Sequence, residues 1–313
     1  MKKLLALLLA FVMVFSLVAC ESESDNDRDD RDDRDSSYDK HNSDESDKDD
    51  ESDREDKPGG NKISFTEAIA VDNEECLIRI TGIDPDNIWG YTLKAYLENK
   101  SEDKTYMFSI ESAAINGVQC DPLFVAEVAP GKKANEEISF SSEILEKYDI
   151  GDYTDIELTF RVYDANDWSA DPVAQETVHV YPYGEDKAVQ FVRESQATDN
   201  LIIDNEYVTV IVTDYDPDNF WGYAVNLYLI NKTDKNIMFS ADDVSVNGFM
   251  VDPFYGEMVS AGKCAFSSMT WFEENLEENN ISDIEEIEFT FRAYDYDNWS
   301  GDDFANETIT LNP

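Results

Sequence analysis

The chain has 313 residues, of which 70 are Asp or Glu and 24 are Lys or Arg, so its formal net charge at neutral pH is −46. A field of this sign repels the phosphates of nucleic acids and the head groups of anionic lipids. The composition therefore argues against nucleic-acid binding and against direct electrostatic docking on a membrane. It leaves cations and basic or neutral partners as candidates.

The N-terminus is typical of a secretory signal. Two lysines precede an apolar run from Leu4 to Val18, and the small residue Ala19 follows it. A run of about 15 residues is short for a bilayer span, which needs about 20. The residues Leu17-Val18-Ala19-Cys20 resemble a bacterial lipobox. We therefore expect residues 1–19 to be a cleaved lipoprotein signal peptide and a lipid on Cys20 to hold the mature chain on the extracytoplasmic face of the cell membrane. An ordinary secretory signal with a chance cysteine is the alternative.

An acidic segment follows the cysteine. Residues 21–57 hold 19 Asp or Glu, 7 Lys or Arg and a single aromatic residue, Tyr38. Such a segment has too little apolar surface to offset the entropy of ordering, and its like charges extend it. We predict that residues 20–61 are a disordered tether, with a cation-binding or protein-docking tail as the alternative. Without residues 21–57 and the two N-terminal lysines, 51 acidic and 15 basic residues remain, so the rest of the chain is strongly acidic as well.

The remaining sequence occurs twice. Four segments of the first half return in the same order, first 132 and then 131 residues later. They are VDNEECLIRITGIDPDNIWGY (71–91) with IDNEYVTVIVTDYDPDNFWGY (203–223), YLENK with YLINK, MFSIESAAINGVQCDPLF with MFSADDVSVNGFMVDPFY, and DIELTFRVYDANDWS (155–169) with EIEFTFRAYDYDNWS (286–300). Each unit has about 125 residues, the usual size of one domain. The chain is therefore predicted to contain two tandem domains, 62–185 and 186–313, that fold separately.

Apolar residues in both copies recur with period two, as in Ile156–Tyr163 and Ile287–Arg292, which is the pattern of half-buried strands. Turn signals such as DPDN, NG and GK separate these runs. One helical turn is expected at 142–147 and again at 273–278. The fold class is predicted to be all-β, with each copy an immunoglobulin-like β-sandwich, and a closed barrel is the alternative.

The ordered motifs also support a resemblance. A DPDN loop, a strand ending in NK, an MFS…NG…DP hairpin, a GK turn and a final FR-YD strand resemble the immunoglobulin-like repeats of uncharacterised clostridial-type (Gram-positive) surface lipoproteins. The resemblance covers nearly all of 62–313. It implies the fold and an extracytoplasmic setting, and it implies no activity.

Cysteines and histidines give little sign of chemistry. Cys76 and Cys120 correspond to Val208 and Val251 in the second copy, which favours small buried side chains over a disulfide, although a bridge between them stays open. The two histidines are His41 in the tether and His179 in a predicted last strand. No nucleophile, metalloprotease or nucleotide-binding motif is present. The chain is therefore not expected to be an enzyme, and an envelope hydrolase is the last alternative.

Two acidic loops in each copy are the candidate metal sites. In an immunoglobulin-like sandwich they are expected between the second and third strands and between the last two strands, at one shared end. Asp and Asn oxygens meeting there suit calcium, a hard cation, whereas turn formation is the simpler reading of the same residues. The candidate ligands are Asp84, Asp86, Asn87, Asp164, Asn166 and Asp167 in the first copy, and Asp214, Asp216, Asp218, Asn219, Asp295, Asp297 and Asn298 in the second.

The same loops carry four tryptophans that are the candidate partner-binding residues: Trp89, Trp168, Trp221 and Trp299. Tryptophan beside polar loops is a good anchor for a protein or a sugar. The opposing interpretation is core packing, because Trp89 and Tyr91 are two residues apart and would share one face of a strand. The sequence as a whole predicts a non-catalytic surface lipoprotein that binds an extracellular protein or glycan and requires no cofactor. A calcium-dependent version of this module is the first alternative.

Overall fold

The structure is a computed structural model that describes residues 62–313 except residue 121 and residues 142–145. The predicted signal peptide 1–19, the lipidation site Cys20 and the tether 20–61 lie outside the described residues. Within the described part of the chain, no helix is long and apolar enough to cross a membrane.

Alternating side chains build the strands, as the period-two pattern predicts. In the strand that begins at Ile156, the side chains of Leu158, Phe160 and Val162 are fully buried, whereas those of Thr159 and Arg161 between them are partly exposed. Burying an aliphatic or aromatic side chain of this size stabilises the fold by about 1.5–3 kcal/mol. Each copy thus has one face of every sheet turned toward an apolar core.

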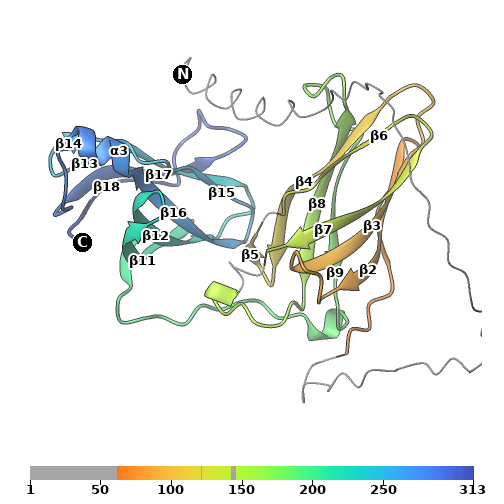
Figure 1. Ribbon diagram of the computed structural model, residues 1–313, viewed down its shortest axis with the longest axis horizontal. Coiled ribbons are helices and arrows are strands. Elements are labelled where there is room, and N and C mark those ends of the chain that lie inside the picture. The colour runs from red at the N-terminus through yellow and green to blue at the C-terminus, as the bar shows by residue number, and fades with distance from the viewer. Residues whose placement is uncertain (1–61, 121, 142–145) are drawn as a thin grey trace, which may run out of the picture. The chain divides into compact units, whose positions relative to one another are not determined.

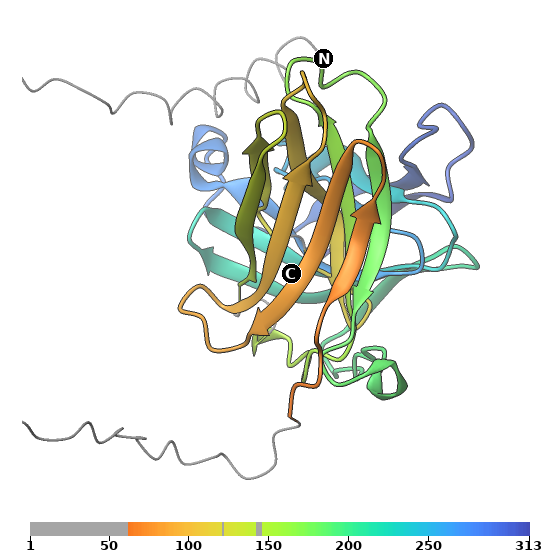
Figure 2. The same cartoon turned by 90° about the vertical axis from the view of Figure 1, so that its right-hand side faces the viewer.

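The strands within residues 68–180 form the first sandwich (Figure 1). Its strands are β1 (Ala68–Asp72), β2 (Cys76–Asp84), β3 (Tyr91–Asn99), β4 (Tyr106–Ile115), β5 (Val118–Gln119), β6 (Val125–Val128), β7 (Lys133–Phe140), β8 (Ile156–Asp164) and β9 (Ala174–Val180). One sheet has the order β1-β2-β3-β7 and faces the viewer in Figure 2. The other places β4 beside β8 and β8 beside β9, with β5 and β6 on the free edge of β4.

Residues 200–311 repeat this arrangement after a short 3₁₀ helix at Glu185–Lys187. The strands are β10 (Asn200–Asp204), β11 (Val208–Asn219), β12 (Gly222–Asn231), β13 (Ile237–Val246), β14 (Phe249–Met250), β15 (Glu257–Val259), β16 (Cys264–Phe272), β17 (Ile287–Asp295) and β18 (Ala305–Leu311). One sheet has the order β10-β11-β12-β16, and in the other β13 lies between β14 and β17, with β18 outside β17 and β15 also paired with β13.

The strand pairing is that of an immunoglobulin-like sandwich, so the predicted fold class is confirmed. In each copy the third strand pairs with the late strand β7 or β16, the fourth pairs with β8 or β17, and the last two form a hairpin. Strands β1 and β10 are additional edge strands. The expected helical turn is present as α3 (Glu273–Glu278) in the second copy. Its counterpart in the first copy falls mostly on residues 142–145, outside the described residues.

The NG and NK dipeptides are structural. Asn116 and Gly117, like Asn247 and Gly248, have positive φ angles, which suits the tight turns that join β4 to β5 and β13 to β14. The asparagine of NK is buried in both copies. The Asn99 amide donates to the carbonyl oxygens of Lys104 and Val128 at 2.8 and 2.7 Å, so this side chain organises the loop after β3 from within.

Residues 62–313 belong to one compact unit, and the two sandwiches contact each other within it. Cys264 of β16 pairs with Val118 of β5 in parallel, and the rings of Tyr148 and Phe266 stack with centroids 3.6 Å apart. Cys76 is not in a disulfide, so the alternative bridge to Cys120 is absent. Burial raises the pKa of the Cys76 thiol to about 11, as expected for a cysteine that serves as a small apolar core residue.

Candidate functional site

The two acidic loops of each copy lie at opposite ends of the sandwich. The first loop joins β2 to β3, so it adjoins the start of β3 at Tyr91. The second loop follows Asp164, which pairs with Tyr106 at the start of β4, beyond the end of β3. The nine residues of β3, at about 3.3 Å each, separate the loops by roughly 30 Å.

The expected convergence of the acidic loops is therefore wrong in both copies. It placed the first loop between the second and third strands of the sandwich and at the same end as the last loop. Because β1 is an additional edge strand, β2 is the first strand of the sandwich and β3 is the second. The loop therefore joins the first and second strands, which places it at the other end. In the second copy the hairpin closes at Asn219 and Gly222, whereas Asp295 pairs with Ile237 at the opposite end of β12. Asp84 and Asp86 thus do not meet Asp164 and Asn166, nor do Asp214, Asp216 and Asp218 meet Asp295 and Asp297.

Turn formation uses many of the loop oxygens. Asn87 Oδ1 accepts the backbone N–H of Trp89 at 3.0 Å, and Asn219 Oδ1 accepts that of Trp221 at 3.1 Å. Asp164 Oδ1 accepts the N–H of Asn166 at 3.0 Å. These are the local bonds by which Asn and Asp side chains fix a turn. The simpler reading of the acidic loops, turn chemistry, accounts for these contacts.

Cations of the protein contact the second pair of loops. Lys235 Nζ lies 2.5 Å from Asp295 Oδ2, and this contact holds the pKa of that carboxyl below its usual range. Lys104 Nζ lies 3.7 Å from Asp164 Oδ2. In the described part of the chain, no group of three or more His, Cys, Asp or Glu side chains is arranged to hold a metal ion. Binding of calcium by a single loop stays a prediction, and so does the role of Asp167 and Asn298 as its ligands.

The four loop tryptophans lie on the surface in both copies. Trp89 and Trp221 are 72 and 63% exposed, and Trp168 and Trp299 are 76 and 74% exposed. The core-packing interpretation is therefore wrong for them. Gly90, with a φ of 107°, lies between Trp89 and the buried Tyr91 and turns the chain so that the two side chains separate. The fifth tryptophan, Trp271, is fully buried and donates from Nε1 to the carbonyl oxygen of Val251 at 2.9 Å.

Further aromatic side chains extend this surface in the second copy. The ring centroid of Trp221 lies 4.9 Å from that of Phe220 and 6.4 Å from that of Phe272, and Phe272 lies 6.0 Å from Phe254. All four rings are exposed. We did not identify Phe254 or Phe272 from the sequence, because each belongs to a motif that reads as an ordinary strand end or turn.

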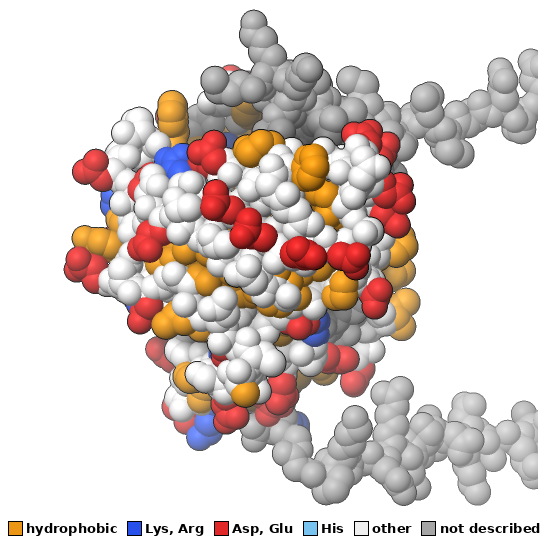
Figure 3. Space-filling model, turned by 90° about the vertical axis from the view of Figure 1, so that its left-hand side faces the viewer, with side chains coloured by type: hydrophobic (Ala, Val, Ile, Leu, Met, Phe, Trp, Pro, Cys, Tyr) orange, Lys and Arg blue, Asp and Glu red, His pale blue; other side chains and the backbone are white. Residues whose placement is uncertain are grey.

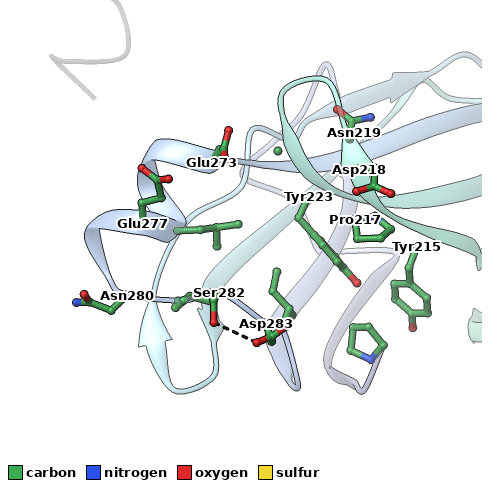
Figure 4. Close-up of a pocket in the computed structure, with 15 residues that line it drawn as sticks. Tyr215, Pro217, Asp218, Asn219, Tyr223, Glu273, Glu277, Asn280, Ser282 and Asp283 are labelled. Atoms are coloured by element: carbon green, nitrogen blue, oxygen red, sulfur yellow. Dashed lines mark hydrogen bonds between the residues drawn. The ribbon is translucent and has the colours of Figure 1, made fainter.

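A cavity of about 970 Å³ lies at the same end of the second sandwich (Figure 4). Its walls are the hairpin between β11 and β12, the helix α3 and residues 280–284. Apolar lining comes from Tyr215, Pro217, Tyr223, Leu276 and Ile284. The face of this sandwich seen in Figure 3 carries a band of hydrophobic side chains edged by Asp and Glu. Sequence reasoning missed the cavity because its walls are distant in sequence.

The histidine within the described residues is His179, and its side chain has a carboxylate partner. Its Nδ1 lies 2.7 Å from Asp155 Oδ1, and its ring stacks on Tyr181 with centroids 5.6 Å apart. The side chain is exposed on strand β9, the strand in which the sequence predicted it.

Comparison with known proteins identifies no family. No family model matches the sequence, and no curated protein matches it. Among solved structures, the chain is similar to the YadV chaperone, with 11% identity, coverage of 70% of this chain and 92% of that chain, and a TM-score of 0.22. It is also similar to the CsuC–CsuE chaperone–tip adhesion subunit complex of Acinetobacter baumannii, with 12% identity, coverage of 70 and 90%, and a TM-score of 0.20. Similarities this weak carry no argument, so the immunoglobulin-like assignment stands on the strand pairing.

Proposed function

We propose that this chain is a non-catalytic surface lipoprotein whose paired sandwiches bind an extracellular protein or glycan. The observation that carries the proposal is the exposure of four tryptophans at equivalent loop positions in both copies. Leaving a tryptophan in water forgoes the stabilisation that burial of its large apolar surface gives. Both copies nevertheless place one at each end of the sandwich. Tryptophan is also among the residues that most often dominate binding energy at interfaces.

The anchoring part of the proposal rests on the lipobox-like residues before Cys20 and on the acidic segment after it. A lipid on Cys20 would keep the sandwiches at the cell surface, as in the clostridial-type surface lipoproteins that the repeats resemble. Metabolic labelling with an alkyne fatty acid tests this directly. The native protein should carry the label, and the Cys20→Ala variant should not. Absence of label on the native protein would contradict the anchoring.

Binding through the tryptophans is tested with the soluble chain 21–313 and isolated cell envelopes, with and without protease treatment. The double variant Trp89→Ala with Trp221→Ala removes the pair at one end of each sandwich, and Trp168→Ala with Trp299→Ala removes the pair at the other. We expect at least one variant to bind envelopes about tenfold more weakly, since a hot-spot residue contributes about 1.4 kcal/mol or more. An unchanged melting temperature would show that the folds are intact.

Protease treatment separates the two classes of partner. If the partner is a protein, treatment of the envelopes abolishes binding, whereas a glycan partner survives it. Envelopes that bind the native chain and both variants equally would contradict the role of the tryptophans.

A further inference from the structure

One contact between the two sandwiches joins two different surfaces. Val118 of β5, in the first copy, pairs in parallel with Cys264 of β16, in the second. The backbone N–H of Cys264 donates to the carbonyl oxygen of Gly117 at 3.1 Å. The side-chain amide of Gln119 donates to and accepts from the backbone of residues 258–260 at 2.5 and 2.8 Å. A short edge strand of one copy thus lies along an edge strand of the other.

Apolar and charged side chains complete this contact. Val118 is fully buried, and Cys264 packs in the same apolar cluster. Lys263 Nζ lies 2.5 Å from Glu157 Oε2, so an ion pair also joins the two copies. Separate proteins use the same combination when one of them adds a strand to the exposed sheet edge of another.

Each of these surfaces occurs once more in the chain, because the two copies are equivalent. Strand β5 corresponds to β14 (Phe249–Met250), which pairs only with β13 in the described chain. Phe249 and Met250 are 51 and 67% exposed, whereas Val118, the counterpart of Phe249, is fully buried. Strand β16 corresponds to β7, which lies at the edge of its sheet and pairs only with β3 in the described chain. Both surfaces therefore lack the strand that covers their counterparts.

The ion pair of the inner contact also has free counterparts. Lys132 corresponds to Lys263, and Glu288 corresponds to Glu157. Both Lys132 and Glu288 are exposed, and neither makes an ion pair with another described residue. We call Lys132 with its neighbour Lys133 the β7 surface, and Glu288 with Phe249 and Met250 the β14 surface.

Sequence differences between the copies make the two free surfaces more complementary in charge. Lys133 takes the place of Cys264 on the β7 surface, and Glu285 takes the place of Thr154 beside the β14 surface. Both side chains are exposed. One free surface is therefore more positive, and the other more negative, than the surface to which it corresponds.

We propose that copies of this chain associate head to tail, with the β14 surface of one copy on the β7 surface of the next. Glu288 pairs with Lys132 of the next copy, and the strand pairing covers Phe249 and Met250. Because the two surfaces differ, every added copy leaves one of each free, so the assembly stays open. This inference goes beyond the proposed function, because it requires only a second copy of the chain.

The contact between chains is weaker than the contact within one. The stacked rings of Tyr148 and Phe266 correspond to Asn279 and Asn135 on the free surfaces, so part of the apolar contact is lost. The net charge of −46 on each chain also opposes association. We therefore expect a reversible association that depends on concentration. The lipid anchor proposed above would raise the local concentration at the cell surface.

Sedimentation velocity of the soluble chain 21–313 tests the association. The weight-average mass should rise continuously between micromolar and submillimolar concentration and pass that of a dimer. A mass that stays that of the monomer would overturn the proposal. So would a plateau at the dimer, because it would indicate a contact between identical surfaces.

Charge reversals locate the contact. Lys132→Glu and Glu288→Lys each place like charges opposite one another, so each should weaken association about tenfold. Their equimolar mixture, and the chain that carries both changes, again place opposite charges at the contact and should associate within about threefold of the native chain. Glu176→Lys, at an exposed position of β9, changes the net charge as Glu288→Lys does and should not weaken association.

Cross-linking tests the register independently of affinity. Val118 and Cys264 are partners in the inner contact, and their counterparts are Phe249 and Lys133. A chain with Phe249→Cys mixed with a chain with Lys133→Cys should therefore form a disulfide between chains when oxidised with copper phenanthroline. Neither variant should do so with the native chain.

The outcomes of the variants are decisive in both directions. Equal weakening by Glu176→Lys and Glu288→Lys, or no recovery in the mixture and in the double variant, would show that net charge rather than this contact governs association, and would overturn the proposal. Absence of the cross-link would overturn it as well. The assays contain no cell envelope, so their failure leaves the proposed binding of an extracellular partner intact, and failure of envelope binding leaves the self-association standing.

Discussion

Replacing Asn231, the last residue of β12, by alanine should strongly destabilise the second sandwich. Asn231 is the asparagine of the NK pair, and its side chain is 1% exposed. Its amide donates to the carbonyl oxygens of Lys235, Val259 and Ser260 at 2.7, 2.9 and 3.0 Å. Its Oδ1 accepts both the N–H and the hydroxyl of Thr233 at 2.9 and 2.8 Å.

The magnitude follows from these bonds. A hydrogen bond of this kind contributes about 1 kcal/mol net, and buried groups left without a partner cost about 1–3 kcal/mol. Some of the freed groups can reach water, so we expect a loss of roughly 3 kcal/mol rather than the sum of all five contacts. For a domain of about 125 residues this lowers the melting temperature by about 10 °C.

Calorimetry and urea denaturation of the chain 21–313 measure the effect. Asn99→Ala is the matched variant in the first copy, and it removes three bonds rather than five, those to Lys104, Val128 and Ser101. Its loss should be smaller, about 2 kcal/mol. A loss below about 1 kcal/mol for Asn231→Ala, or a larger loss for Asn99→Ala, would refute the reasoning.

Three further predictions concern the turns, acid stability and calcium. Gly222→Ala should lower the free energy of unfolding by more than about 2 kcal/mol in urea denaturation, because φ is 136° and a Cβ would lie 2.3 Å from the carbonyl oxygen of Trp271. Gly248→Ala, with open space around it, should cost about 1 kcal/mol, and equal losses would contradict the reasoning. Hydrogen bonds from Lys235 and Arg292 lower the pKa values of Asp295 and Asp303, respectively. The stability that these carboxylates provide is therefore present above the unfolded pKa near 3.8 and is lost as the pH falls below it. Arg292→Gln should flatten this part of a curve of stability against pH, and an unchanged slope would contradict the assignment. Millimolar calcium should change the melting temperature by less than about 1 °C, because the acidic loops lie at opposite ends of each sandwich. A shift of several degrees, abolished by the double variant Asp216→Ala with Asp297→Ala, would instead show that single loops bind the ion.

Much of the fold could be predicted from local sequence. The alternation in Ile156–Tyr163 reappears as the buried side of β8, and the NG pairs reappear as tight turns with positive φ angles. The repeated motifs also made equivalent positions comparable without a structure. These features depend on a few adjacent residues, so the local sequence is enough to predict them.

The arrangement of the loops depended on a strand count that the sequence does not state. An additional edge strand such as β1 has the same local pattern as a first sandwich strand, and it moves the Asp84 loop to the other end. For Trp89 the sequence left two interpretations, an exposed anchor and core packing on the face of Tyr91, and Gly90 decides between them because it interrupts the strand period. The cavity at Tyr223 combines residues 215–223, residues 273–284 and Pro313, which are distant in sequence, so no local pattern could indicate it.

Hydroxyl-radical footprinting of the five tryptophans tests the central claim most directly. The protein is oxidised once as the soluble chain 21–313 and once on intact cells, and tryptophan oxidation is read by mass spectrometry. Trp271, which is fully buried, is an internal control that should resist oxidation in both states. We predict that Trp89, Trp168, Trp221 and Trp299 react readily in the soluble chain and that at least one pair of them is protected several-fold on cells. Equal oxidation of all four in both states would contradict the claim that these side chains bind a partner at the cell surface.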